Sequence, residues 1–317
     1  MVDRVETAAT KSPGEAAEPE HRCGFIAIVG APNAGKSTLV NALVGAKIAI
    51  VSRKVQTTRV PVRGIAMEGA SQLIFIDTPG LFAPKRRLDR AMVEAAAGAA
   101  ADADVVALVI DAVKGLDKEA SAILERLEPL RSPRVLVLNK VDNLSKKEAL
   151  LALSAKINQR LAFTSTFMIS AEGGSGVAAL RTWLANTVPT GPWHYPEDEI
   201  TDSTERATAA EVTRERIYDL LHDELPYQTT VETTAFKELR DGSVRIEQTV
   251  FVERDSQKRI VLGEKGQTVK QISSESRAEL ARMFERPVHL FLFVKVRENW
   301  ENDPERYREM GLDFPKE

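Results

Sequence analysis

The sequence predicts an α/β protein of two domains, in which a mainly parallel sheet flanked by helices precedes a smaller α+β domain. Its 317 residues, 43% hydrophobic and 28% charged, are enough for two cores of ordinary size. From Phe25 onwards, short β-branched runs alternate with longer helical patterns, which indicates βαβ units. Near Pro189 this alternation stops at a segment rich in proline and acidic residues, which is typical of a linker.

The chain ends and the composition limit the class of protein. Residues 1–21 contain no apolar stretch like a signal-peptide core and are expected to be a disordered tail. The most apolar region, Ala95–Val113, is interrupted by three aspartates, which excludes a membrane-spanning helix. A single cysteine, Cys23, provides neither a disulfide framework nor a thiolate metal site. We therefore expect a soluble, cytoplasmic protein.

Five apolar runs are expected to form the parallel sheet, because apolar residues at nearly every position indicate burial on both faces. The more polar segment Pro61–Glu68 precedes the second run by a short turn and is expected to be an antiparallel edge strand. The five runs are FIAIVG at 25–30, LIFID at 73–77, VVALVID at 105–111, RVLVLN at 134–139 and TFMIS at 166–170.

The second domain shows the order αββααβ. We expect a helix at about 209–225, strands near 231–239 and 244–254 joined by an Asp-Gly turn, two helices flanking GEKG at 263–266, and a last strand over 288–297. In the last strand, apolar residues alternate with others, so one face should lie on a core. The assigned boundaries are 22–189 for the first domain, 190–206 for the linker, 207–298 for the second domain and 299–317 for a C-terminal tail.

The sequence GAPNAGKST lies between the first strand and a helical pattern, which is the context that a phosphate-binding loop requires. Its glycines allow backbone N–H groups to converge on phosphate oxygens, and the helix N-terminus adds its dipole. Lys36 would reach the β- and γ-phosphates, and the Ser37 hydroxyl would ligate magnesium. The candidate residues are Gly30, Ala31, Pro32, Asn33, Ala34, Gly35, Lys36, Ser37 and Thr38.

The sequence DTPGL ends the second apolar run at the carboxyl edge of the sheet, where ligands bind in such folds. Asp77 can hold magnesium through a water molecule. The backbone N–H of Gly80 can reach a γ-phosphate, so the loop could sense whether that phosphate is present. The candidate residues of this loop are Asp77, Thr78, Pro79, Gly80 and Leu81.

The sequence NKVD follows the fourth run. The Asp142 carboxylate can accept both the N1 and the N2 protons of guanine, whereas adenine would leave it unpaired, so GTP is favoured over ATP. The Lys140 stem would lie along the base plane. A backbone N–H of the Ser170–Ala171 pair would reach the guanine carbonyl. The candidate guanine-binding residues are Asn139, Lys140, Asp142, Ser170 and Ala171.

Through GAPNAGKS, DTPG, NKVD and SAE, residues 22–189 resemble the translation-factor class of P-loop GTPases. The resemblance implies a Ras-like fold and a switch threonine that ligates magnesium. QTTR at 56–59 stands in its place, and of Thr57 and Thr58 we choose Thr58. Leu81 occupies the position at which relatives often carry a catalytic glutamine, and a leucine cannot orient water. Asn33 is associated with potassium in related GTPases, so potassium is a further candidate ligand beside GTP or GDP and magnesium.

With VSRKVQTTR, DTPGL and GEKG together, the chain resembles the Era family within the TrmE-Era-EngA group. That family joins a Ras-like GTPase domain to a type II KH domain, whose G-x-x-G loop clamps about four nucleotides. The resemblance implies a monomer that binds 16S rRNA near its 3′ end, acts in 30S subunit assembly and associates peripherally with the inner membrane. The candidate RNA-binding residues are Lys258, Arg259, Gly263, Glu264, Lys265, Gly266 and Lys270.

Local charge agrees with RNA binding. The whole chain has a net charge of −3, yet Arg254–Arg297 contains ten Lys or Arg against five Asp or Glu. Two other classes remain: a GTP-gated module that docks on a protein or membrane, and a GTPase subunit of an RNA-modifying enzyme. The second is disfavoured because the C-terminal half lacks a catalytic cysteine, a metal cluster and a second cofactor loop.

Overall fold

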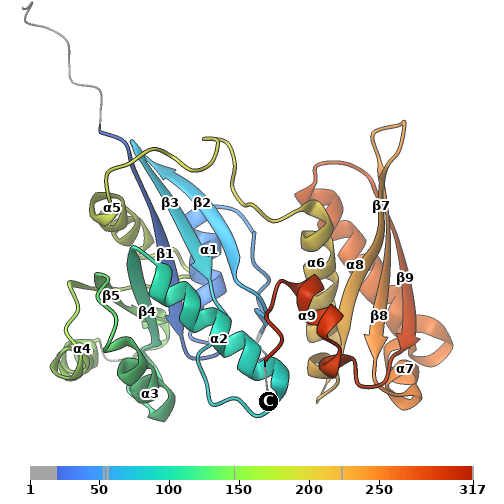
Figure 1. Cartoon of the computed structure of the whole chain (residues 1–317), viewed down its shortest axis with the longest axis horizontal. Helices are drawn as coiled ribbons and strands as arrows, with labels where there is room; N and C mark the ends of the chain where they lie inside the picture. Colours follow the sequence, from blue (N-terminus) through green and yellow to red (C-terminus); the bar gives the residue numbers. More distant parts are fainter. Residues whose placement is uncertain (1–19, 53, 55–56, 146, 223, 316–317) are drawn as a thin grey trace, which may run out of the picture.

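This computed structural model describes residues 20–52, 54, 57–145, 147–222 and 224–315, so nearly all of the expected N-terminal tail lies outside it. The first domain contains a six-stranded sheet of order β2-β3-β1-β4-β5-β6 (Figure 1). Neighbouring strands are parallel except β2 and β3, which pair antiparallel at the edge, as expected. The strands are β1 (Arg22–Gly30), β2 (Val62–Glu68), β3 (Ser71–Asp77), β4 (Val105–Asp111), β5 (Arg134–Asn139) and β6 (Ser165–Met168).

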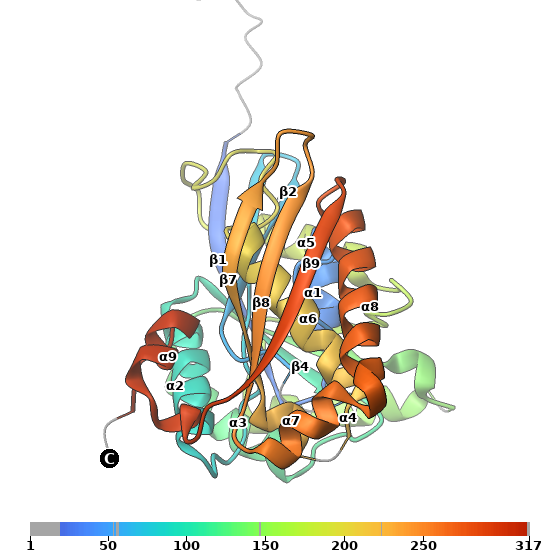
Figure 2. The same cartoon turned by 90° about the vertical axis from the view of Figure 1, so that its right-hand side faces the viewer.

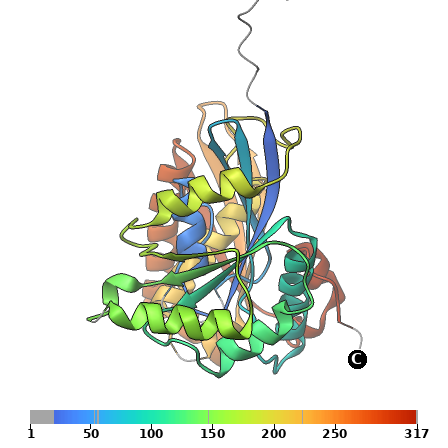
Figure 3. The same ribbon diagram turned by 90° about the vertical axis from the view of Figure 1, so that its left-hand side faces the viewer.

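Helices cover both faces of this sheet because its parallel strands are apolar on both sides. One core packs α1 and α5 against the sheet, and the other packs α2, α3 and α4 against the opposite face. Figure 3 views these helices from the side of the first domain. Their bounds are α1 (Lys36–Val44), α2 (Arg87–Asp102), α3 (Lys118–Leu127), α4 (Glu148–Arg160) and α5 (Val177–Thr187), with a short η1 (Val141–Asn143) after β5.

The second domain has the expected order αββααβ. Its sheet β7-β8-β9 pairs β7 antiparallel and β9 parallel to β8, and α6 and α8 lie behind the sheet in Figure 2. The elements are α6 (Glu205–Leu220), η2 (Leu225–Gln228), β7 (Thr230–Glu238), β8 (Val244–Val252), α7 (Asp255–Leu262), η3 (Glu264–Gly266), α8 (Gln267–Met283) and β9 (Val288–Val296).

Helix α6 begins and ends earlier than the expected span of 209–225. Thr204 caps its N-terminus, because the Thr204 hydroxyl accepts a hydrogen bond from the Ala207 N–H at 3.2 Å. The helix ends at Leu220, and Pro226 lies in the short η2 turn that follows. The Thr204 cap therefore sets the start of the helix.

The C-terminal residues do not form the expected tail. They form η4 (Trp300–Asn302) and α9 (Pro304–Met310), which lie beside α2 of the first domain in Figure 1. Trp300 and Tyr307 are fully buried in an apolar cluster with Leu88 and Met92 of α2. Burial of these two aromatic side chains stabilises the packing of residues 300–310 against α2. The assignment of a C-terminal tail did not take them into account. Within the described residues, no helix combines the length and the apolar character needed to cross a bilayer.

Candidate nucleotide-binding and RNA-binding sites

The loop between β1 and α1 has the backbone of a phosphate-binding loop. Gly35 has φ +95° and caps α1, and a Cβ atom there would lie 2.2 Å from the Asn139 amide nitrogen. Gly30 has φ +155°, and a Cβ atom there would lie 2.3 Å from the Val109 carbonyl oxygen. Only glycine fits both positions. Directly after Gly35, Lys36 turns back over the loop, and its ammonium donates to the Ala31 carbonyl at 3.1 Å.

Three oxygen-bearing side chains converge beside this loop. The Ser37 hydroxyl donates to Asp77 Oδ2 at 2.7 Å, the Thr58 hydroxyl donates to the same oxygen at 3.0 Å, and the two hydroxyls lie 3.0 Å apart. Asp77 Oδ1 is buried and has no hydrogen-bond partner among the residues that the structure describes. Hydroxyl and carboxylate oxygens are the donors that magnesium prefers. This set fits magnesium and includes the chosen Thr58, whereas Thr57 lines the neighbouring cavity.

Burial sets the electrostatics of this cluster. Burial lowers the pKa of the Lys36 ammonium to about 8, and the nearby Asp77 carboxylate opposes that shift. Burial also raises the pKa of Asp77, while the charge of Lys36 and the hydrogen bonds from Ser37 and Thr58 act to lower it. A buried cation and a buried carboxylate thus face the same site, which suits a ligand that carries both phosphates and a metal ion.

Two NKVD side chains form hydrogen bonds with the phosphate-binding loop after β1 and with the end of β4. The Asn139 side chain donates to the Ala34 carbonyl at 2.9 Å, and Lys140 Nζ donates to the Asn33 carbonyl at 2.6 Å and to Asp111 Oδ2 at 2.8 Å. Lys140 adopts a left-handed backbone at φ 65°. Asp142 is exposed in η1. Sequence reasoning missed Asp111, although an aspartate that ends a buried strand was a usable signal.

The backbone of the Ser170–Ala171 pair is hydrogen-bonded within the first domain. The Ala171 N–H donates to Asn139 Oδ1 at 2.9 Å, and the Ser170 N–H donates to the Ser175 carbonyl at 3.0 Å. Both N–H groups therefore donate to acceptors within the protein in this structure.

Switch-loop residue Leu81 is part of the core. Its side chain is 2% exposed and packs in the apolar cluster beneath α2 and α3, while its N–H donates to the Gly30 carbonyl at 3.1 Å. The Thr78 hydroxyl donates to the Ile28 carbonyl at 2.7 Å, Pro79 is buried, and Gly80 lies against Pro32. Leu81 therefore points away from the phosphate loop and does not obstruct it.

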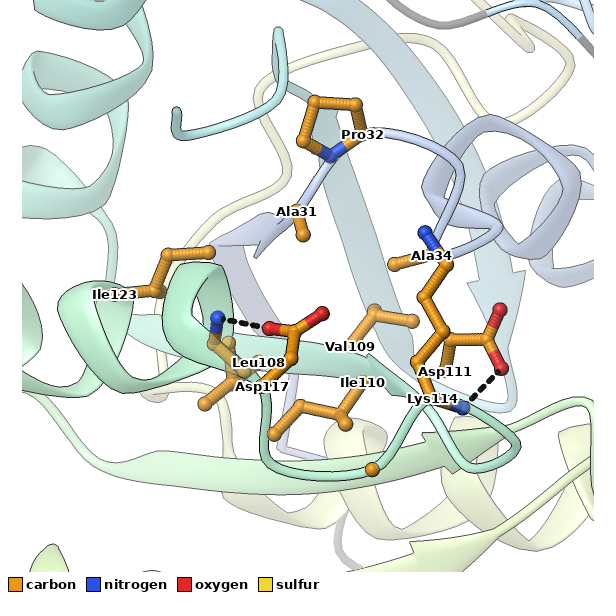
Figure 4. A pocket seen from close by; sticks show the side chains of 12 residues that line it. Ala31, Pro32, Ala34, Leu108, Val109, Ile110, Asp111, Lys114, Asp117 and Ile123 are labelled. Atoms are coloured by element: carbon orange, nitrogen blue, oxygen red, sulfur yellow. Dashed lines mark hydrogen bonds between the residues drawn. The ribbon is translucent and has the colours of Figure 1, made fainter. Parts of the chain in front are cut away.

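A cavity of about 800 Å³ opens over the phosphate loop. The second domain supplies part of its wall, namely Tyr218, Asp219 and His222, which sequence reasoning missed. Its first-domain lining is Pro32, Asn33, Gly35, Lys36, Ser37, Thr38, Val51, Ser52, Lys54, Thr57, Thr58, Gly80, Lys140 and Glu172. A separate pocket behind the loop, lined by β4 and Asp117, has only about 10 Å³ and is too small for a nucleotide (Figure 4).

The segment that carries the switch threonines lies against the second domain. Lys47 forms ion pairs with Glu215 and Glu279, both at 2.6 Å. The Val51 N–H donates to the other oxygen of Glu215 at 2.8 Å, and the Ser52 hydroxyl donates to Asp219 at 3.2 Å. The nucleotide cavity and the second domain thus share one boundary.

The GEKG loop exposes its two charged side chains. Gly263 has φ +73°, and a Cβ atom there would lie 2.2 Å from the Thr268 hydroxyl, whereas a Cβ atom at Gly266 would meet nothing within 4 Å. Gly266 caps α8, so the helix N-terminus opens towards the loop. Glu264 and Lys265 are exposed. Nearby, Arg259 on α7 and Lys270 on α8 are exposed, and Lys258 is half-buried.

Comparison with known proteins identifies a family for each domain. Residues 25–140 match a family described as 50S ribosome-binding GTPase, and residues 224–301 match the KH domain family. GTPase Era of Afipia carboxidovorans is 60% identical, over 96% of this chain and 98% of that relative.

Two solved structures superpose with a TM-score of 0.88 at 36% identity, over 92% of this chain and 99% of each of theirs. One is a variant of Aquifex aeolicus Era bound to GDP and AlF4−, and the other is Era in complex with MgGDPNP and nucleotides 1506–1542 of 16S ribosomal RNA.

Proposed function

Because this chain belongs to the Era family of GTPases, we propose that it is a GTP-hydrolysing switch that binds 16S rRNA through its KH domain during 30S subunit assembly. The observation that carries the proposal is the convergence of Ser37, Thr58 and Asp77 within 3.0 Å of one another beside the glycine-bounded loop. The relatives that bind GDP and AlF4−, and MgGDPNP with rRNA, support both halves of it.

In the nucleotide site, the phosphate loop and Lys36 would bind the phosphates, and Asp142 would select guanine. Ser37 and Thr58 would hold a magnesium ion directly, and Asp77 would hold it through water. When bound, magnesium neutralises the charge that develops on the phosphate oxygens. Since Leu81 is buried in the core, backbone groups such as the Gly80 N–H would position the attacking water, and we expect slow intrinsic hydrolysis.

In the KH domain, the GEKG loop would clamp the RNA backbone. Gly266 has open space around it, so a phosphate can approach the backbone at the N-terminus of α8. Positive charge comes from Lys265 in the loop and from Lys258, Arg259 and Lys270 on the two helices that flank it. Such a clamp holds about four nucleotides.

A single preparation can test both halves. GTP hydrolysis and binding of the 1506–1542 RNA segment should both be present, and Ser37→Ala should abolish magnesium-dependent nucleotide binding while leaving the fold intact. A folded wild-type protein that binds neither GTP nor this RNA would overturn the proposal.

Finer parts of the proposal need their own measurements. We place the protein in the cytoplasm as a monomer, with peripheral association at the inner membrane that vesicle co-sedimentation can test. Potassium near Asn33 would accelerate hydrolysis, so equal turnover in sodium and potassium buffers would exclude a role for potassium.

Binding to isolated 30S rather than 50S subunits tests the ribosomal partner. The proposed boundaries, 22–189 and 207–298, can be tested by expressing each domain alone.

A further inference from the structure

The KH sheet has an open face. Helices α6 and α8 cover its inner face, and the opposite, outer face is turned towards the viewer in Figure 2, with α7 at its lower end. The strand pairing places Arg245 beside His289 and Thr249 beside Phe293, so alternate residues of each strand share this outer face. The exposed outer-face side chains are Lys237, Arg245, His289, Phe291, Phe293 and Lys295.

Two aromatic rings stand on the β9 side of this face. Phe291 is 41% exposed and Phe293 is 50% exposed, although phenylalanine is normally among the buried residue types. Because they are two residues apart on β9, their rings project from the same side of the sheet. The Arg245 guanidinium lies 4.3 Å from the centroid of the Phe291 ring. Two rings and a guanidinium plane therefore form one exposed platform.

Positive charge surrounds the rings. The outer face of the strands and the end of β9 carry four basic residues, Lys237, Arg245, Lys295 and Arg297, against two acidic ones, Glu232 and Glu247. Two of these basic residues have acidic partners, since Arg245 contacts Glu247 at 2.8 Å and Arg297 contacts Asp303 at 2.5 Å. The face is thus basic within a chain of net charge −3, and this charge suits a polyanion.

We propose that this open face is a second RNA surface, on which unpaired bases stack against Phe291 and Phe293. The inference rests on the proposed RNA-binding function and extends it. Aromatic rings beside basic side chains are the usual platform for single-stranded RNA, since every base can stack whatever its sequence.

The length of the RNA supports a second surface. A G-x-x-G clamp holds about four nucleotides, whereas the related Era complex contains nucleotides 1506–1542. Strand β9 is at the edge of the sheet, next to α7 and α8. RNA that leaves the GEKG loop can therefore pass around this edge onto the outer face.

The test compares two double variants. Phe291→Ala with Phe293→Ala removes the rings, and Leu151→Ala with Val113→Ala removes two apolar side chains, 70% and 54% exposed, from the first domain. Affinity for the 1506–1542 RNA should fall about tenfold per ring in the first variant and stay unchanged in the second. Both proteins should retain the wild-type circular dichroism spectrum.

Salt dependence separates stacking from charge. The ring variant should keep the wild-type slope of log affinity against log salt, because no phosphate contact is lost. Arg245→Gln with Lys295→Gln should instead reduce that slope by about 2. Unchanged RNA affinity in the folded ring variant would overturn the second surface, and so would a dimer that only the ring variant disrupts.

Crosslinking covers the case in which the ring variant fails to fold. Wild-type protein irradiated with 4-thiouridine-labelled RNA should yield crosslinked peptides from 288–297 as well as from the GEKG loop. Crosslinks confined to the GEKG loop would overturn the proposal of a second RNA surface but would leave the proposed function intact. If the wild type binds no RNA at all, the proposed function itself fails, so the two failures are distinguishable.

Discussion

The Arg59 guanidinium lies 5.8 Å from the centroid of the Trp300 ring and is almost completely buried. It also donates to the backbone carbonyls of Thr229 at 2.8 Å and Tyr227 at 3.2 Å in the second domain. Its neighbour in sequence is Thr58, which contacts Ser37 and Asp77. One peptide bond therefore separates the candidate metal ligand from an anchor in the RNA-binding domain.

Arg59→Lys should weaken the coupling between nucleotide and RNA. A lysine keeps the charge but cannot contact several carbonyls and a ring at once. We expect the ratio of RNA affinities in a GTP analogue and in GDP, typically 5- to 150-fold for such coupling, to fall towards one. Fluorescence anisotropy in each nucleotide measures the ratio. A wild-type ratio in the folded variant would show that the coupling follows another route.

The ion pair between Lys47 and Glu279 predicts that the free energy of unfolding depends on pH. Burial acts to raise the pKa of Glu279, but Lys47 and Arg216 outweigh it, so the pKa is lowered overall. A lowered carboxylate pKa stabilises the fold at neutral pH, and this contribution is lost as pH falls through the folded-state pKa. Lys47→Gln should therefore cost about 1 kcal/mol at pH 7 and less at pH 3 in urea unfolding. An equal cost at both pH values would contradict this origin.

Asp142→Asn should shift the preference from guanine towards xanthine nucleotides. The amide complements the altered base edge of xanthine, whereas guanine loses its acceptor for two protons. Competitive titration of labelled GTP with XTP measures the change. Asn143→Ala, at the neighbouring exposed position, serves as the control and should bind GTP normally. Unchanged GTP affinity in Asp142→Asn would count against the guanine assignment.

Leu81→Ala should reduce stability without accelerating hydrolysis. The side chain is buried in the core, so its removal leaves a cavity that costs about 2–4 kcal/mol of unfolding free energy. Chemical denaturation and single-turnover hydrolysis on the same sample measure both effects. Faster hydrolysis at unchanged stability would mean that the leucine obstructs water, contrary to its position here.

Replacing Glu264 and Lys265 with aspartate should abolish RNA binding and leave GTP binding unchanged. The change replaces the Lys265 cation with a second carboxylate beside that of residue 264, while both glycines are kept. Lys156→Asp on α4 is a matched control, since it also lowers the net charge by two at an exposed site. Residual RNA binding should show a shallower salt slope than the wild type. If the folded variant binds RNA with wild-type affinity, the GEKG loop is only a turn between two helices and does not bind RNA.

Local patterns in the sequence were enough to predict most elements and the proximity of the candidate nucleotide-binding loops. GAPNAGKST, DTPG and NKVD each follow a buried strand, and parallel strands bring their carboxyl ends to one edge. Their proximity therefore follows from strand order alone. The alternation in β9 and the glycines of GEKG were likewise visible, because a strand face and a helix cap depend on only a few consecutive residues.

Tertiary packing decided what links these parts. Arg59 meets Trp300, Lys47 meets Glu279 and Tyr218 lines the nucleotide cavity, although each pair of partners is far apart in sequence. No local period encodes such contacts, since they depend on how two separately formed cores dock. For the same reason, the segment after β9 was taken as a tail: its aromatic residues are buried only because α2 of the other domain lies beside them.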